Sequence, residues 1–369
     1  MSMATFHEAL KHKNRISPML LKRAEVMAVG VGYVDPHKPS LGASVIVYTH
    51  DKIVPSGLNN LKSVAAKLGS AVPVRFLSSG SFKAHSVPAL KPKVFRPKSF
   101  TSRIRPVPGG VSIGKAIPAA TGTAGVIVIK NNQLYILSNN HVLIRNNSAS
   151  FSETLQPGPA DGGVSGADRV GRAFQFVPLR PGAVNFQDSS LAVPTSNHRL
   201  NPRYLINGAG RLIKVPGHLL SYPVGLQVMK TGRTSGFVRG TVESNNVDVR
   251  VSYGGSLGTL LFRNQTVIHG NTGPVSLPGD SGSVWLRASD RYAAALNFAG
   301  TADGIRSISN PIGLVMSTYG VRIAVPTAGG TYIAGKVKGV APIGNSSYVQ
   351  PLTEQQRKRI RAILVKPAK

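Results

Sequence analysis

The stretch Gly279-Asp280-Ser281-Gly282-Ser283 decides the fold of this chain, because it places a serine inside a glycine-bounded turn. Glycine adopts backbone conformations that other residues avoid, so the amide groups of such a turn are able to converge on one point. A serine hydroxyl is a weak nucleophile at neutral pH and needs a positioned base, and that base needs a third group to orient it. We therefore expect both groups elsewhere in the chain.

Two upstream segments supply candidates for these groups. Asn139-Asn140-His141-Val142 offers an imidazole, and Gln187-Asp188-Ser189-Ser190-Leu191-Ala192 offers a carboxylate. Asp188 follows His141 by 47 residues and precedes Ser281 by 93. Each segment alone is compatible with an ordinary turn or a structural residue. Their combination in this order, each at a strand end, favours nucleophilic catalysis by serine.

In this order the three residues resemble the catalytic triad of the chymotrypsin-fold (trypsin-like) serine peptidases. Four longer segments sharpen the resemblance, and together they look like the narrow-leaf-type trypsin-like proteins of plants and their bacterial relatives. The resemblance covers most of residues 26–322. The four segments are 134–141, 155–158, 230–236 and 278–283.

The resemblance implies a mostly β fold, a chymotrypsin-like double β-barrel whose active site lies in the cleft between the barrels. We place barrel one at about 121–215 and barrel two at about 222–322. The hairpin of residues 125–138, in which two apolar runs flank Asn131-Asn132-Gln133, would deliver His141 at the end of its second strand.

The resemblance also implies roles for individual residues. Ser281 would be the nucleophile, His141 the general base and Asp188 the acid that orients it. The backbone amides of Gly279 and Ser281 would form the oxyanion hole. The implied function is a serine endopeptidase that hydrolyses peptide bonds through an acyl-enzyme.

Substrate choice is implied by the positions around this turn. In the resembled family the floor of the primary pocket lies six residues before the nucleophile, which is Val275 here, with Ser276 beside it. Valine offers no charge to a lysine or arginine, so we expect small or apolar residues before the scissile bond. An extended substrate should pair with an edge strand that contains Asn297, Phe298, Ala299 and Gly300.

Three serines depart from the usual pattern of the resembled family. Ser283 replaces the second glycine of the commoner motif, and Ser189 and Ser190 stand where small apolar residues usually follow the catalytic aspartate. Neither change removes a catalytic group. No processing site of the zymogen type is evident before the peptidase segment.

The rest of the chain divides by composition into appendages. Residues 1–85 predict a small α/β domain, with helices over about 5–25 and 58–68 and strands over 26–34, 43–48 and 72–77. Prolines and lysines in 86–120 predict an extended linker. The peptidase occupies 121–330, and the basic segment 331–369 carries a predicted helix at 352–364.

Within the predicted linker, Gly109 to Lys115 nearly spells a phosphate-binding loop. The next residue is Ala116, so the hydroxyl that would bind Mg²⁺ is missing, and Pro118 disfavours the helix that such a loop requires. Nucleotide hydrolysis is therefore not expected here.

Composition limits the remaining functions. The 369 residues contain no cysteine, which excludes disulfides and thiolate ligands, and the nine histidines are scattered without a His-Glu-x-x-His motif. We expect no metal and no cofactor. No transmembrane run and no secretory signal are recognisable, which predicts a cytoplasmic protein.

Charge leaves the partners open. There are 44 Lys and Arg against 14 Asp and Glu, a net charge of +30. Such a field attracts nucleic acid or acidic surfaces, and general cationic solubility explains it equally well. Besides the endopeptidase with its polypeptide substrate, two hypotheses remain: a peptidase-fold binding or assembly subunit, including a homo-oligomer, and a nucleic-acid-associated protein.

Overall fold

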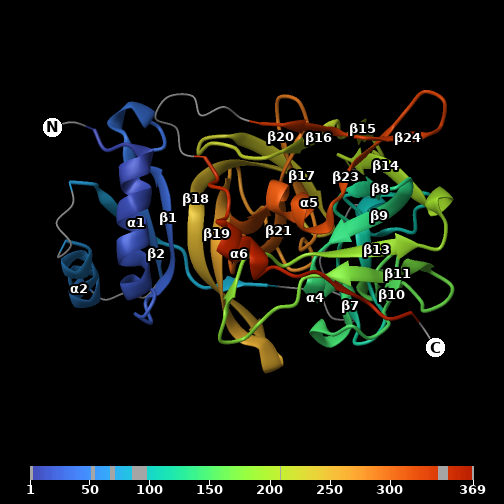
Figure 1. Ribbon diagram of the computed structural model, residues 1–369, viewed down its shortest axis with the longest axis horizontal. Coiled ribbons are helices and arrows are strands. Elements are labelled where there is room, and N and C mark those ends of the chain that lie inside the picture. The colour runs from blue at the N-terminus through green and yellow to red at the C-terminus, as the bar shows by residue number, and fades with distance from the viewer. Residues whose placement is uncertain are drawn as a thin grey trace.

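The chain is built mainly from β-strands that form two large sheets (Figure 1). The mostly β class predicted from the sequence is therefore confirmed. Within the described residues no helix is long and apolar enough to cross a membrane. The computed structural model describes residues 3–50, 55–66, 71–84, 98–207, 209–339 and 348–367.

The larger sheet holds thirteen strands of the described chain and mixes the N-terminal segment with the second half of the sequence. Three short strands attach beside its main path: β4 (Phe82–Lys83), β16 (Gly217–Leu219) and β25 (Lys336–Lys338). The main path runs β12 (Val184–Asn185), β19 (Gly258–Gly270), β22 (Arg306–Pro311), β21 (Ala293–Thr301), β20 (Val284–Arg287), β17 (Gln227–Gly232), β18 (Gly236–Gly254), β1 (Val26–Tyr33), β2 (Ala43–Thr49) and β3 (Val74–Ser78).

The second sheet holds ten strands and carries the segment that contains His141 and Asp188. Its hairpin of β8 (Ile127–Lys130) and β9 (Gln133–Ser138) matches the hairpin predicted at 125–138. A small third sheet joins β15 (Leu212–Lys214), β14 (Leu200–Leu205) and β5 (Val107–Gly109). The second sheet runs β24 (Tyr332–Ala334), β23 (Arg322–Pro326), β8 (Ile127–Lys130), β9 (Gln133–Ser138), β13 (Ser190–Pro194), β11 (Arg169–Phe176), β10 (Glu153–Leu155), β6 (Ser112–Lys115) and β7 (Ala120–Thr123), with β26 (Ile363–Leu364) beside β11.

The N-terminal unit forms the helices and strands that its sequence predicts, and it continues the larger sheet. Helix α1 (Phe6–Leu20) begins with a capping box between Thr5 and Glu8, which satisfies amides of its first turn. It covers β1 and β2, while α2 (Pro55–Ala66) lies at the outer side (Figure 1). Strand β1 pairs antiparallel with β18, so the unit and the second half of the chain share backbone hydrogen bonds.

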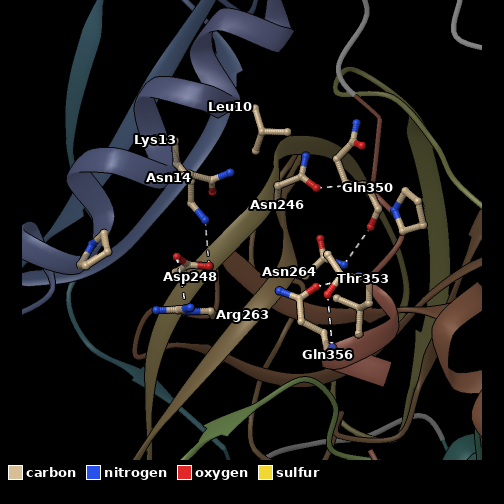
Figure 2. Close-up of a pocket in the computed structure, with 13 residues that line it drawn as sticks. Leu10, Lys13, Asn14, Asn246, Asp248, Arg263, Asn264, Gln350, Thr353 and Gln356 are labelled. Atoms are coloured by element: carbon tan, nitrogen blue, oxygen red, sulfur yellow. Dashed lines mark hydrogen bonds and ion pairs between the residues drawn. The ribbon is translucent and has the colours of Figure 1, made fainter. Parts of the chain in front are cut away.

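A buried ion pair anchors α1 to β18 (Figure 2). Lys13 Nζ lies 2.8 Å from the carboxylate of Asp248, and the Ser17 hydroxyl donates to the same carboxylate at 2.8 Å. Burial lowers the pKa of Lys13, and the charge of Asp248 opposes that shift. The pair borders a cavity of about 380 Å³ between α1, the β18–β19 hairpin and the C-terminal residues 350–356.

The predicted linker, residues 86–120, needs correction in its second half. Residues 85–97 lie outside the described part of the chain, but β5 and β6 are strands whose Val107 and Ile113 are fully buried. Proline is common in linkers, but it also fits edge strands and strand starts. The Lys115 of the near phosphate-binding loop is the last residue of β6.

The predicted C-terminal helix is also shorter than expected. Helix α6 covers only Glu354–Lys358, and Ile363–Leu364 forms β26 instead. These two residues pair with Gln175 and Phe176 at the edge of β11. The strand edge offers backbone partners that a solvated helix end would lack, so tertiary pairing overrides the local helical pattern.

His218 gives the fold a testable pH dependence. Burial, reinforced by Arg322, lowers the pKa of His218 from 6.5 to about 4. The unfolded chain therefore binds more protons than the folded chain between these values, and stability falls as the pH drops through that window. In His218→Gln the loss of unfolding free energy between pH 7 and pH 4.5 should be smaller by about 2 kcal/mol, measured by urea unfolding.

The exposed His198 supplies the matched control, since His198→Gln should leave the pH dependence unchanged. An equal loss of stability in wild type and His218→Gln would contradict the prediction.

Candidate active site

Asp188 lies in the loop between β12 and β13 and is fully buried. Its Oδ1 accepts the backbone N–H of Asn140 at 2.7 Å. Its Oδ2 accepts the Tyr253 hydroxyl at 2.7 Å and lies 2.5 Å from His141 Nδ1. Because an ionised carboxylate only accepts hydrogen bonds, this contact assigns the proton to Nδ1 of the imidazole.

Two asparagines hold the backbone of Asp188. The Asn310 amide accepts from Asp188 N–H at 3.0 Å through Oδ1 and donates to the Asp188 carbonyl at 3.1 Å through Nδ2. Asn139 donates to the same carbonyl at 2.7 Å. The position of the carboxylate is thus set by three segments that are far apart in sequence.

The serines that depart from the family pattern after Asp188 have polar partners. Ser190 Oγ donates to the Asn139 carbonyl at 2.7 Å, and Ser189 Oγ lies 2.9 Å from the Tyr319 hydroxyl. Both serines are buried, and a buried hydroxyl is tolerated when it is hydrogen-bonded. The hydroxyls therefore tie the loop of Asp188 to the end of β9 and to α5 (Ile312–Tyr319).

His141 is placed by a short helix that follows β9. It is the second residue of α4 (Asn140–Leu143), and its carbonyl accepts Lys115 Nζ at 2.5 Å. Burial lowers the pKa of Lys115 to about 8, and the charge of Asp188 opposes that shift. Among the described residues Nε2 of His141 has no hydrogen-bond partner, so its lone pair is open to a proton donor.

Ser281 lies in a turn that glycine makes feasible. The φ angles of Gly279 and Gly282 are +102° and +95°, in the region that disfavours side chains. A Cβ added to Gly282 would lie 2.1 Å from the Thr123 carbonyl oxygen. Ser281 Oγ donates to the Phe298 carbonyl at 3.2 Å.

Strand β7 brings the serine turn and the histidine helix together. A Cβ added to Gly122 would lie 2.6 Å from Val142 and 2.7 Å from the Ser281 carbonyl oxygen. The neighbouring Thr123 N–H donates to that carbonyl at 2.7 Å. The residue after His141 and the backbone of Ser281 therefore both contact β7 at Gly122.

The Asp280 carboxylate stabilises the turn by accepting hydrogen bonds from backbone N–H groups. Its Oδ1 accepts the backbone N–H groups of Thr234 and Ser235, each at 2.9 Å, and its Oδ2 accepts that of Leu277 at 3.0 Å. Lys230 Nζ lies 3.6 Å from the same carboxylate, and both side chains are fully buried. Asp280 therefore stabilises the backbone around Ser281.

Lys230 and Ser283 complete this support. The Lys230 ammonium lies 5.3 Å from the centre of the Trp285 ring, and burial lowers the pKa of Lys230 against the opposing charge of Asp280. Ser283, which replaces a glycine of the commoner motif, donates its hydroxyl to the Asp280 carbonyl at 2.6 Å. The departure therefore adds a hydrogen bond inside the turn.

The predicted primary-pocket residues lie directly before this turn. Val275 is 1% exposed and packs in the core with Trp285. Ser276 Oγ donates to Asn297 Oδ1 and to the Ala299 carbonyl, both at 3.1 Å.

The predicted substrate-pairing strand is β21, but it is not the edge strand that was expected: β22 pairs along one side of it, and β20 and β4 pair with the two ends of its other side. Gly300 pairs with Lys83 and Thr301 with Phe82, both of β4 in the N-terminal unit. In the middle of β21, Asn297 Nδ2 donates to the Asp280 carbonyl at 3.1 Å. An extended peptide on β21 would therefore meet β4 at Gly300.

Sequence reasoning missed four groups of this site: Tyr253, Asn310, Lys115 and Lys230. Lys230 belongs to the segment 230–236 that carries the family resemblance, but sequence reasoning assigned it no role. Lys115 belongs to the stretch that nearly spells a phosphate-binding loop. Nothing near Tyr253 or Asn310 in the sequence connects either residue to Asp188, since they follow it by 65 and 122 positions.

The buried pair of Asp280 and Lys230 generates a prediction. In Asp280→Asn the Lys230 charge would remain in the interior without its counter-ion, which typically costs about 3–5 kcal/mol. Urea unfolding should show this loss. The double variant Asp280→Asn/Lys230→Met removes the orphaned charge and should regain about half of it. Equal losses in the single and double variants would contradict the assignment.

Part of the chain is similar to known proteins. No family model matches the chain. Streptogrisin-C of Streptomyces griseus is 28% identical over 148 residues, which are 40% of this chain, so the match spans only 30% of that protein. Among solved structures, a glutamic acid-specific serine protease is 20% identical over 59% of this chain and 100% of its own, with a TM-score of 0.42. Protease A of Thermobifida fusca is 19% identical over 62% of this chain and 99% of its own, also with a TM-score of 0.42.

Proposed function

We propose that this chain is a serine endopeptidase that uses Ser281, His141 and Asp188. One observation carries the proposal: a fully buried Asp188 carboxylate contacts Nδ1 of His141 at 2.5 Å, while Nε2 of the same ring has no partner among the described residues. An imidazole held in this tautomer is ready to accept a proton at Nε2. The partial match to streptogrisin-C supports the same activity.

The proposed reaction has two halves. Ser281 Oγ attacks the scissile carbonyl while its proton passes to His141 Nε2, and the tetrahedral intermediate collapses as His141 returns the proton to the leaving amine. Water then repeats the sequence on the acyl-enzyme and releases the new carboxyl terminus. Asp188 keeps its charge throughout and stabilises the imidazolium.

The amides of Gly279 and Ser281 are proposed to form the oxyanion hole. The positive φ of Gly279 and the hydrogen bonds of Asp280 support this role, because they hold the turn in one conformation. Removing one such donor typically raises the barrier by about 2.7–4 kcal/mol. A turn fixed in advance needs no reorganisation when the negative charge develops.

For the substrate we propose small or apolar residues before the scissile bond. Val275 and Ser276 carry no charge that would select lysine or arginine. The substrate backbone would pair with β21 at Asn297, Phe298, Ala299 and Gly300. A domain division at 1–85, 121–330 and 331–369, a nearest likeness to narrow-leaf-type plant proteins and a cytoplasmic location remain predictions.

Covalent labelling tests the proposed activity. A fluorophosphonate probe should label the wild-type chain at Ser281, located by mass spectrometry, and should not label Ser281→Ala. The probe is small and reacts at the nucleophile, so β4 on the edge of β21 does not exclude it. In Asp188→Asn, kcat on denatured casein should fall by about 10⁴-fold, because the imidazole loses the partner that sets its tautomer.

The exposed Ser289 on the turn after β20 provides the matched control, and Ser289→Ala should label like wild type. If wild-type protein takes up no label and cleaves no denatured casein at several pH values, the endopeptidase proposal fails. The binding or assembly role would then become the better explanation of the fold.

A peptide library tests the proposed preference. Peptides that differ only in the residue before the scissile bond should give higher kcat/KM with alanine, valine or leucine than with lysine or arginine, because the pocket floor lacks a counter-charge. A preference for lysine or arginine would contradict the assignment of Val275 while leaving the triad intact.

A further inference from the structure

Tyr253 connects the tip of a long hairpin to the candidate triad. It is the penultimate residue of β18, and its hydroxyl donates to Asp188 Oδ2 at 2.7 Å. The same oxygen lies 2.5 Å from His141 Nδ1. The rings of Tyr253 and His141 meet edge to face, with centres 5.7 Å apart and an interplanar angle of 82°.

The backbone before Tyr253 is held on both sides. Val251 and Ser252 pair with β19 across the hairpin and with β4 of the N-terminal unit on the other side. Beyond Tyr253 the chain turns through Gly254 and Gly255, whose φ angles are +67° and +52°. The hairpin therefore ends beside the imidazole of His141.

Aromatic packing fixes the direction of the Tyr253 ring. Tyr253 stacks on Phe262 of β19, with ring centres 6.0 Å apart. The ring centres of Phe262 and Phe298 are 4.8 Å apart. The carbonyl of Phe298 accepts the hydroxyl of Ser281. One continuous aromatic row thus runs from the strand beside the nucleophile to the carboxylate that orients the base.

The hydroxyl remains a donor across the working pH range. Burial, followed by the nearby charge of Asp188, raises the pKa of Tyr253 well above its usual value. The other titratable groups around Asp188 are His141, Lys115 and Tyr319. Among these four titratable groups, only His141 and Tyr253 contact the Asp188 carboxylate in the hydrogen bonds of the described residues.

We propose that Tyr253 is a positioning residue of the peptidase: its hydroxyl orients the Asp188 carboxylate toward His141 and draws charge from the shared oxygen. This inference rests on the proposed function. A carboxylate that shares its charge with the Tyr253 hydroxyl attracts the imidazolium less strongly, so the hydroxyl weakens the ion pair that forms when His141 takes up a proton, and it also fixes the geometry of the carboxylate.

Tyr253→Phe tests the inference, because it removes the hydroxyl and keeps the ring. On a casein-derived peptide, kcat should fall by about 10-fold or more with KM nearly unchanged, since the interaction acts on the base and not on substrate binding. The acid limb of the kcat/KM profile should move up by about half a pH unit or more. The His141 titration, followed by NMR in Ser281→Ala and in Ser281→Ala/Tyr253→Phe, should move in the same direction.

Tyr48→Phe is the matched control. Tyr48 lies in the same hydrophobic cluster, and its buried hydroxyl donates to another carboxylate, that of Glu243, at 2.9 Å. This variant should lose stability yet keep the acid limb and the His141 titration of wild type.

The outcomes separate this inference from the proposed function. Absence of labelling in wild type would overturn the peptidase itself. Normal wild-type turnover with an unshifted acid limb and His141 titration in Tyr253→Phe would overturn the role of Tyr253 alone. A loss of kcat that only follows a loss of folded protein, with an unmoved titration, would likewise assign Tyr253 to packing.

Discussion

A negative charge buried away from water is the constraint around which this site is organised. Asp188 has no exposed surface, and a carboxylate in such a place is stable only when its oxygens are hydrogen-bonded. Its donors come from α4, from the hairpin β18–β19 and from the imidazole, while Asn139 and Asn310 hold its backbone. Displacing any of these segments would remove hydrogen bonds from the buried Asp188 carboxylate. The geometry of the site and the stability of the interior are therefore coupled.

The shared sheet extends that coupling to the N-terminal unit. Strand β1 pairs with β18, and β4 lies between the end of β18 and the end of β21. One hydrophobic cluster joins Tyr48 and Phe82 of this unit to Phe262 and Phe298 beside the candidate triad. The unit is therefore part of the interior that holds the hairpin, and its removal would expose apolar surface as well as a strand edge.

Local pattern predicted the elements whose partners lie nearby and missed those whose partners lie far away. The N-terminal helices and strands and the hairpin before His141 follow from periodicity and turn residues, and all are present. The stretch 107–115 forms strands, although prolines in this region are typical of a linker. Neighbouring strands supply backbone hydrogen-bond partners that cannot be inferred from its composition. The same reason turns Ile363–Leu364 into a strand beside β11 where a helix was predicted.

The amino-acid sequence alone specified which chemical groups are available: one serine between glycines, and one histidine and one aspartate at strand ends. It also showed that position 275 carries no acidic side chain that would attract lysine. Packing of distant segments settled which oxygen of Asp188 meets His141, that Tyr253 meets it too, and that Ser283 and Ser190 are satisfied. The physical reason is range. A hydrogen bond acts over about 3 Å, and strand register brings together residues separated by 65 or 122 positions at that distance without leaving a local mark in the sequence.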